Sequence, residues 1–472
     1  MLPIAPSPVP PAIWPHPLDD DPARIVREAT GLHAHGATAE AETMLRAALR
    51  LHPQSVILNN ACGVMQAALG RPRDAVAHYR QALRQEGAEP GVWTNLGNAL
   101  TTLKLFDSAV ACHDAALARA PNDGLLHYNR GISLAEAGHH GAAIAAFTAA
   151  LRHAPDHPMA AWDRARSYLH LGNLAAGWAD YEVRLRNGLV PPRAVPGTRW
   201  EGQPYAGRRL LLLAEQGFGD MIWVSRFIAH VKALGGDLIV ESPPELAGLH
   251  RAAGLADRVV IQGDALPPAD FHLWQCSLPG LLADSIAALP PAVELTPTPS
   301  VRARFQPIFA PADGKLKVGI IWSGSTSFGR NSERATRLAP FIDAFDLPGV
   351  QLYSLQKGPP AQELADAAAD TVVDLGPLLQ GFDDTAGALS HLDLIIMTDS
   401  AVAHLAGTMQ RPVWVLLGRN AHWLWLAERT DSPWYPSMRL FRPRGEDDWS
   451  FVFDQAAKAL WHRLEQPRPV LR

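Results

Sequence analysis

The sequence predicts an all-helical repeat solenoid followed by two α/β domains, each built on a parallel sheet. Small residues recur every 34 positions through the first part of the chain, which indicates stacked helical units. Beyond residue 208, short apolar strands alternate with helical segments, which is typical of parallel sheets covered by helices. A stretch rich in proline and glycine separates the two regions and marks a domain boundary.

Length and composition fit a soluble protein of several domains. The chain has 472 residues, of which 47% are hydrophobic and 19% charged, and its net charge is −5. Such a small charge does not favour binding to nucleic acid or to an anionic membrane. No apolar run approaches the roughly 18 residues of a membrane-spanning helix. Cys62, Cys112 and Cys276 lack metal-ligand spacing, so we expect core thiols, no metal site and a reducing, cytoplasmic location.

The chain is expected to divide into five segments. The first is a proline-rich arm without a basic start, which favours an extended, disordered segment over a signal peptide. The predicted boundaries are residues 1–21 for this arm, 22–191 for the repeats, 192–208 for the linker, 209–305 for the first sheet domain and 315–472 for the second.

The repeats are defined by small residues that let two antiparallel helices approach closely. These positions are Gly63, Gly97 and Gly131, then Ala41, Ala75, Ala109 and Ala143, then Ala48, Ala82, Ala116 and Ala150. The pattern resembles the tetratricopeptide repeat, and a fifth, degenerate unit over residues 159–185 would cap the stack. Such a solenoid presents a concave groove to a peptide or protein. The alternative is that the array is only a spacer or an oligomerisation element.

Two runs of strands follow, joined by a proline-rich stretch at residues 289–300. Two parallel-sheet domains would face each other, and a ligand would bind between them, outside the carboxyl ends of the strands. The expected strands cover residues 209–214, 237–241, 258–261 and 271–275 in the first domain, and 317–322, 350–355, 371–375, 392–397 and 412–417 in the second.

The first candidate site is "AEQGFGD", which follows the strand at 209–214. Gly217 and Gly219 permit a tight turn, and Asp220 begins a helix, with Gln216 on the same turn. A helix-capping aspartate gives the same pattern, so this motif alone is weakly specific. The third glycine of a dinucleotide fingerprint is absent, which argues against a nicotinamide enzyme.

The second candidate site collects groups that suit a phosphate at three strand ends. Free N–H groups at a helix N-terminus and a lysine at a strand end both favour an anion. The alternatives are a core histidine and a plain helix cap. A hydrolase triad is set aside because no G-x-S-x-G elbow is present. The candidates are Gly324 and Ser325 in "WSGST", Gln356 and Lys357 in "SLQKG", and Asp399, Ser400, Ala401 and His404 in "DSAVAH".

These motifs, with "PVWVLLG" and "DSPWYPSMRLFR", resemble the bacterial tetratricopeptide-repeat glycosyltransferases. Their catalytic half is similar to the heptosyltransferases of glycosyltransferase family 9, which implies a GT-B fold of two Rossmann-like domains facing a cleft. The layout is also similar to protein O-GlcNAc transferase and to transferases that glycosylate flagellin. The family's "R-S-x-P-L" run stands here as "RATRL", residues 334–338, and its "G-E-Q-G" as "AEQG", which leaves the sugar open.

The resemblance implies a function for individual residues. Asp399, Ser400 and His404 match the run that binds the donor diphosphate, Lys357 would face the same phosphates, and Asp220 matches a proposed catalytic base, with Glu215 in reserve. A nucleotide-sugar would be attacked by an acceptor hydroxyl, with inversion and with neither metal nor cofactor. The repeats would select a protein acceptor. The alternative function is an adaptor that binds proteins through its repeats and keeps an inactive transferase fold.

Overall fold

The computed structural model describes residues 21–87, 89–367, 370–445 and 448–465. The chain divides into two compact units at residue 160. The predicted proline-rich arm lies outside the described residues except for Asp21, whose Oδ1 accepts a hydrogen bond from the Ala23 amide and so caps the first helix. In the part of the chain that is described, no helix combines the length and the apolar character that a membrane crossing requires.

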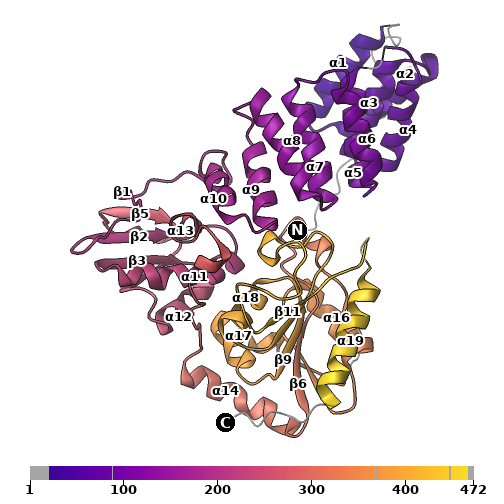
Figure 1. The fold of residues 1–472 in the computed structure, drawn as a ribbon. Coiled ribbons are helices and arrows are strands. Elements are labelled where there is room, and N and C mark those ends of the chain that lie inside the picture. The colour runs from indigo at the N-terminus through magenta and orange to yellow at the C-terminus, as the bar shows by residue number, and fades with distance from the viewer. Residues whose placement is uncertain (1–20, 88, 368–369, 446–447, 466–472) are drawn as a thin grey trace, which may run out of the picture. The chain divides into compact units, whose positions relative to one another are not determined.

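The first unit consists of antiparallel helix pairs, one pair for each predicted 34-residue unit (Figure 1). Proline or a capping side chain begins several of these helices, as at Pro22, Pro72 and Asp123. The helices are α1 (Pro22–Ala34), α2 (Thr38–Leu51), α3 (Val56–Ala68), α4 (Pro72–Leu83), α5 (Pro90–Thr102), α6 (Phe106–Leu117), α7 (Gly124–Glu136) and α8 (His140–His153).

The recurring glycines mark the positions where an aromatic ring of the second helix touches the backbone of the first. A Cβ added at Gly63 would lie 2.4 Å from the Tyr79 ring, and one at Gly131 would lie 2.5 Å from the Phe147 ring. Gly97 meets the ring of His113 in the same way, at 2.5 Å. A larger residue at any of these positions would push the two helices apart, which explains the period of 34 in steric terms.

His113 stands at a position that holds Tyr79 and Phe147 in two other repeats. We expect this histidine to lower the stability of the repeats in acid. Burial lowers its pKa to about 4, although Nε2 contacts the Ser133 hydroxyl at 3.0 Å. As the pH decreases from 6.5 to 4, His113 becomes protonated in the unfolded chain but stays neutral in the folded protein. The free energy of unfolding therefore decreases over this range, by up to about 3 kcal/mol. His113→Phe should reduce this dependence in thermal unfolding followed from pH 7.5 to 4, while a part remains because burial also lowers the pKa of His78. An unchanged pH profile would contradict the assignment.

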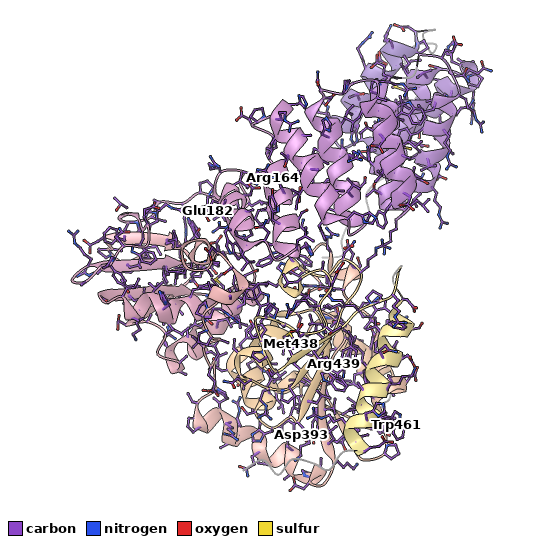
Figure 2. All side chains as sticks on the ribbon, viewed as in Figure 1. Arg164, Glu182, Asp393, Met438, Arg439 and Trp461 are labelled. Carbon is purple, nitrogen blue, oxygen red and sulfur yellow. The ribbon has the colours of Figure 1, made fainter. Side chains whose placement is uncertain are left out.

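The second unit contains the predicted fifth repeat as well as both sheets. Its helices α9 (Ala160–His170) and α10 (Leu174–Tyr181) are tied together by Arg164, labelled in Figure 2, which donates to both carboxylate oxygens of Asp180 at 2.6 and 2.9 Å. Trp178 of α10 packs on Trp223 of the first sheet domain and on Trp423 of the second. The fifth repeat is therefore a built-in part of the α/β region.

The first sheet has five parallel strands in the order β1-β5-β2-β3-β4. Buried leucines at 210–213 place β2 in its interior. The strands are β1 (Thr198–Arg199), β2 (Arg209–Leu213), β3 (Asp237–Ser242), β4 (Arg258–Ile261) and β5 (Phe271–Trp274), with helices α11 (Phe218–Ala233), α12 (Pro244–Ala252) and α13 (Leu278–Leu282).

The second sheet has six parallel strands in the order β11-β10-β9-β6-β7-β8, which is the 3-2-1-4-5-6 order of doubly wound sheets (Figure 1). Its strands are β6 (Leu316–Ile321), β7 (Val350–Ser354), β8 (Val372–Asp374), β9 (Leu394–Thr398), β10 (Val413–Leu416) and β11 (Met438–Phe441). Its helices are α14 (Pro299–Phe309), α15 (Leu338–Phe345), α16 (Gln362–Asp366), α17 (Phe382–Leu389), α18 (Ala401–Thr408) and α19 (Trp449–Glu465).

Three details differ from the sequence-based boundaries. The predicted linker, residues 192–208, contributes β1 to the edge of the first sheet. The strand β11 was not predicted, because "SMRLF" has too little apolar character to stand out. The range 209–305 ends too late, since Phe305 of α14 packs against Gly387 of α17 in the second sheet domain.

Candidate functional site

The predicted site residues follow strands where the order of each sheet reverses. The reversal lies between β2 and β5 in the first sheet, and between β6 and β9 in the second. In open α/β sheets, ligands bind outside the carboxyl ends of the strands at such a switch point. The two switch points are brought together, because α11, which follows β2, contacts α18, which follows β9.

Asp220 lies in the first turn of α11 and holds the turn after β2 in place. Its Oδ2 accepts a hydrogen bond from the Gly217 amide at 3.1 Å, as in a capping box. The side chain is partly exposed, yet desolvation by the surrounding protein raises its pKa to about 6, and the charges of Glu215 and Asp399 raise it further. Asp220 is thus both a cap and a carboxyl that titrates near neutral pH.

Asp399, Ser400 and Ala401 form the junction of β9 with α18. Ser400 is the N-cap, and its Oγ accepts from the Val402 amide at 3.4 Å. Asp399 is buried, which raises its pKa, and the Arg334 guanidinium 3.8 Å from its Oδ2 acts in the opposite direction. Ala401 begins the helix, facing Gly219. The junction therefore has the helix start that the sequence predicts, with a buried carboxyl behind it.

His404 lies one turn into α18 and is a neutral side chain in this structure. Its ring stacks on Trp425, with centroids 4.8 Å apart, and its Nδ1 lies 3.2 Å from the Tyr435 hydroxyl. Burial lowers its pKa to about 3, so it carries no positive charge at neutral pH. The expected charge-stabilising group is therefore at most a neutral N–H donor.

Gly219 is the point where α11 and α18 come closest. A Cβ added there would lie 3.0 Å from His404 Cδ2 and 3.6 Å from the Ala401 Cα. At Gly217, in contrast, the backbone is extended and the nearest atom is Asp220 Oδ2 at 3.6 Å. Of the two glycines in "GFG", the second is therefore required by the close approach of the two helices.

This difference gives a matched pair of variants. We expect Gly219→Ala to destabilise the α/β region by about 1–3 kcal/mol, because the His404 ring is held by Trp425 and cannot yield. Gly217→Ala should leave stability unchanged or raise it by up to about 1 kcal/mol. Thermal unfolding of both variants beside the wild type tests this, and equal melting temperatures for the two would contradict it.

The side chain of Gln356 makes hydrogen bonds to the backbone at two strand ends. Its Oε1 accepts from the amides of Trp322 and Ser323 at 3.1 and 2.9 Å, and its Nε2 donates to the carbonyls of Ser323 and Lys357 at 3.1 and 2.9 Å. The side chain is 2% exposed. The amide of Gln356 therefore joins the ends of β6 and β7, and its assignment to the donor stays a prediction.

The other groups at these strand ends differ in their hydrogen bonds and in their exposure to solvent. Lys357 donates to the Leu379 carbonyl, so its ammonium points to the segment before α17. Ser325 is exposed and its Oγ lies 2.7 Å from the Ser327 hydroxyl. Gly324, on the same loop, is half-buried next to the Arg334 guanidinium. Lys357 and Ser325 are both exposed and Gly324 is partly exposed, so the loop after β6 and the lysine after β7 are accessible.

Arg334 is the residue that sequence reasoning missed. It belongs to "RATRL", which we considered only as a departure from the family pattern. Its guanidinium lies over the exposed ring of Phe328 at 4.4 Å, next to Gly324 and Asp399. The signal that could have identified it is an arginine kept in a loop that had lost the other motif residues.

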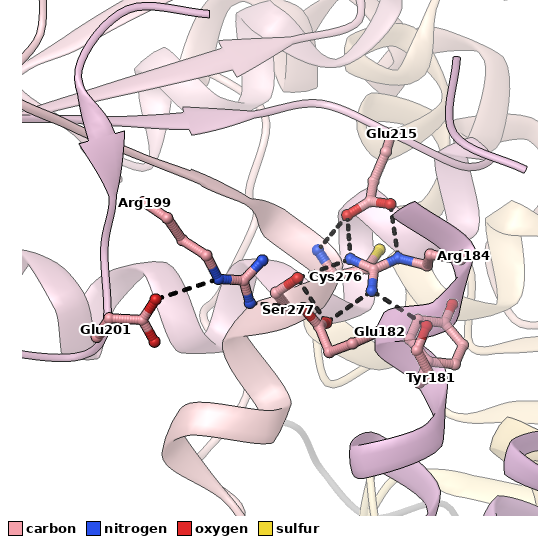
Figure 3. Close-up of polar contacts among 8 residues, drawn as sticks. All are labelled: Tyr181, Glu182, Arg184, Arg199, Glu201, Glu215, Cys276 and Ser277. Carbon is pink, nitrogen blue, oxygen red and sulfur yellow. Dashed lines mark hydrogen bonds and ion pairs between the residues drawn. The ribbon is translucent and has the colours of Figure 1, made fainter. Parts of the chain in front are cut away.

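Glu215, the predicted reserve base, forms an ion pair with a buried arginine (Figure 3). Arg184, which follows α10, donates through Nε and Nη2 to the two oxygens of Glu215 at 2.9 and 2.7 Å. The Cys276 amide and the Ser277 hydroxyl complete the cluster. Both carboxylate oxygens of Glu215 accept hydrogen bonds, and the ion pair fixes the fifth repeat to the end of β2, while the assignment of Glu215 as reserve base stays a prediction.

A cavity of about 210 Å³ lies beside this cluster, at the switch point of the first sheet. Gln216 lines it and has a φ of 62°, a left-handed backbone that is strained for a residue other than glycine. Arg193, also in the lining, pairs with the buried Glu241 and lies over Trp274. The formal charges of the wall are thus paired, and its surface suits an uncharged group.

Metal ligands do not gather anywhere in the described residues. There, no three side chains of histidine, cysteine, aspartate or glutamate are placed to hold one ion. Cys62, Cys112 and Cys276 are free and buried.

Comparison with known proteins identifies the repeats. The family model described as tetratricopeptide repeat matches residues 66–124 and 128–188. The N-terminal region therefore contains tetratricopeptide repeats, and an α/β region with two parallel sheets follows it.

Relatives are found for more of the chain. It is 29% identical over 468 residues to Protein FlbA of Caulobacter vibrioides, with 92% of this chain and 71% of that protein covered. Among solved structures, MamA is 17% identical with a TM-score of 0.32, covering 34% of this chain and 94% of its own. A thermophilic tetratricopeptide-repeat protein of Thermus thermophilus is 23% identical with a TM-score of 0.32, and the match covers 36% of this chain and 92% of that protein.

Proposed function

We propose that the chain is a glycosyltransferase that moves a sugar from a nucleotide-sugar donor to a hydroxyl of a protein acceptor. The two sheet domains would form a GT-B catalytic region, with the nucleotide at the second sheet and the acceptor at the first. The observation that carries this proposal is the meeting of Asp220, whose pKa is raised to about 6, with the start of α18 across the contact at Gly219.

The reaction needs one base and a site for the leaving group. Asp220 takes the proton of the acceptor hydroxyl as its oxygen attacks the anomeric carbon. The bond from that carbon to the diphosphate breaks, and the diphosphate leaves with the electron pair. The N–H groups at the start of α18 and the neutral His404 donate hydrogen bonds to it. One displacement inverts the anomeric centre, and these donors supply what a cation would otherwise supply.

Binding of nucleotides tests the proposal directly. The melting temperature should rise with at least one of UDP, ADP, GDP and CMP, in buffer containing EDTA, because ligand binding stabilises the folded state. Hydrolysis of the matching nucleotide-sugar, also in EDTA, should then be measurable. Activity that appears only on adding magnesium or manganese would refute the metal-independent mechanism.

The rival function is an adaptor that binds proteins through its repeats and has lost catalysis. The engagement of Gln356, Glu215 and Lys357 in structural contacts favours it. An adaptor would show no stabilisation by any nucleotide in the same panel, so one experiment separates the two functions.

The repeats are proposed to select the acceptor in the cytoplasm. Asn60 of α3 and Asn95 of α5 are linked by a hydrogen bond of 3.0 Å and offer polar groups to a bound peptide. Deleting residues 1–155 keeps α9 and α10, which belong to the second unit. Donor hydrolysis should persist in this fragment while transfer to the protein acceptor falls, because the groove no longer concentrates it. Equal acceptor transfer by both proteins would show that the repeats do not select it.

A further inference from the structure

Arg334 contacts both its own loop and the junction that follows β9. It follows the short helical turn Asn331–Glu333, in the connection from β6 to α15, and so lies at the switch point of the second sheet. A Cβ built on Gly324 would meet its Nη2 at 3.0 Å, and its Nη1 lies 3.8 Å from Asp399 Oδ2. Its guanidinium thus lies between the loop after β6 and the junction after β9.

The hydrogen-bonding capacity of Arg334 is almost unused. A guanidinium has five N–H donors, but in the described part of the chain this one makes a single hydrogen bond, from Nε to Asn331 Oδ1 at 3.5 Å. Its ion pair with Asp399 is longer than a direct hydrogen bond. Arg184 shows the opposite case, since its guanidinium is completely buried and bonded to Glu215 on two sides.

Two other cations near these strand ends donate hydrogen bonds to backbone carbonyls. Arg226 of α11 donates to the backbone carbonyls of Trp434 and Trp223, and Lys357 donates to that of Leu379. The nearby histidines are neutral, because burial lowers the pKa of His404 and of His422 to about 3. The charge of Arg334 helps to lower the pKa of both rings and opposes the raised pKa of Asp399, which places this charge at the centre of the site.

The ring of Phe328 fixes the plane of this guanidinium. The ring is 45% exposed, and the Arg334 Cζ lies 4.4 Å from its centroid. Stacking of this kind keeps the planar guanidinium in one orientation, while the N–H groups along its edge can still donate hydrogen bonds.

We propose that Arg334 binds the diphosphate of the donor through two of its N–H groups, with Phe328 holding the guanidinium in plane. The ligand chemistry is a doubly charged diphosphate ester, which matches the bidentate geometry of arginine. Asp399 is the charged partner of Arg334 in this structure, and the phosphate oxygens replace it on binding. This inference rests on the proposed transferase function and deepens it.

The test uses the full-length protein and inorganic pyrophosphate, a probe that does not depend on the nucleotide base. Its dissociation constant is measured by calorimetry for the wild type, for Arg334→Gln and for Arg334→Lys, and the measurement is repeated with the nucleotide that stabilises the wild type. Arg330→Gln is the matched control, because Arg330 lies on the same loop and pairs with Glu333 at 2.7 Å. Melting temperatures without ligand confirm that each variant is folded.

We expect Arg334→Gln to weaken pyrophosphate and nucleotide binding by about 10- to 100-fold, as the loss of charged hydrogen bonds implies. Arg334→Lys should fall between the glutamine variant and the wild type, because a point charge remains without the fork. Arg330→Gln should stay within about twofold of the wild type. The decisive variant is Arg334→Gln if it folds, and Arg334→Lys if it does not. If this variant binds the nucleotide as tightly as the wild type, the assignment of Arg334 is wrong and the transferase proposal stands. A wild type that binds neither ligand overturns both.

Discussion

Replacing Asp220 by asparagine is expected to lower sugar transfer by about 10²–10⁴-fold, the usual contribution of a general base. Asparagine can still accept the hydrogen bond from the Gly217 amide, so the turn after β2 should keep its shape. In the wild type, kcat/KM should fall as the pH decreases through about 6, where Asp220 becomes protonated. The residual activity of the variant should lack this acidic limb.

The same substitution should have the opposite effect on stability. Because the folded-state pKa of Asp220 is raised above its unfolded value of 3.8, the folded protein favours the protonated form, and stability is lost as the pH rises through about 6. Asp220→Asn removes this cost, so its melting temperature should exceed that of the wild type at pH 7.5 and match it near pH 4. A melting temperature below that of the wild type at pH 7.5 would contradict this expectation.

Asp237→Asn is the control for both measurements. Asp237 begins β3 at the amino end of the same sheet, and it is half exposed beside Arg209. It should change neither the acidic limb of the pH profile nor the melting temperature by more than the margin typical of surface substitutions. If Asp237→Asn and Asp220→Asn behave alike, Asp220 is not the base.

The repeats could be predicted from the sequence because their packing is local and repeats itself. The contact of Gly63 with Tyr79 recurs at Gly97 and Gly131, and each pair lies within one helical hairpin. Steric requirements of this kind leave a residue-type signal at a fixed period. The strands β2 and β9 could be predicted for a similar reason, since consecutive buried residues in a central parallel strand give an apolar run.

The partners of the polar site residues could not be predicted, because they come from distant segments. Arg184 and Glu215 belong to different domains of the expected scheme, and Gln356 reaches back to the end of β6. Nothing in "SLQKG" distinguishes an amide that binds a ligand from one that joins two strand ends. Arg334 was missed for the complementary reason, since its use depends on Asp399 and Gly324 lying beside it.

The packing of the fifth repeat on the α/β region could not be predicted from its own sequence. Its sequence shows the repeat register, so we expected it to cap the solenoid. The contacts of Trp178 with Trp223 and Trp423 show that it is also part of the α/β core. An aromatic residue at helical spacing looks the same in either environment, and only the three-dimensional arrangement separates them.

The ion pair between Arg184 and Glu215 should be the largest single polar contribution to the stability of the second unit. Arg184→Met leaves the carboxylate of Glu215 buried without its partner, and removing one side of such a pair typically costs about 3–5 kcal/mol. Glu215→Gln leaves the guanidinium with the Glu182 carboxylate as its remaining charged partner, so its loss should be smaller. Thermal unfolding of the two single variants gives the comparison.

The double variant separates a structural role from a catalytic one. When both charges are removed, no buried ion is left unpaired, so the stability of Arg184→Met with Glu215→Gln should recover much of the loss seen in Arg184→Met alone. Activity per folded molecule should follow the same order, and the acidic limb near pH 6 should remain in every variant, because Asp220 is untouched. A Glu215→Gln protein that melts like the wild type but loses that limb would instead make Glu215 the base. The buried pairing with Arg184 argues against that outcome, because two donors of Arg184 and the Cys276 amide already take up most of the lone pairs of this carboxylate.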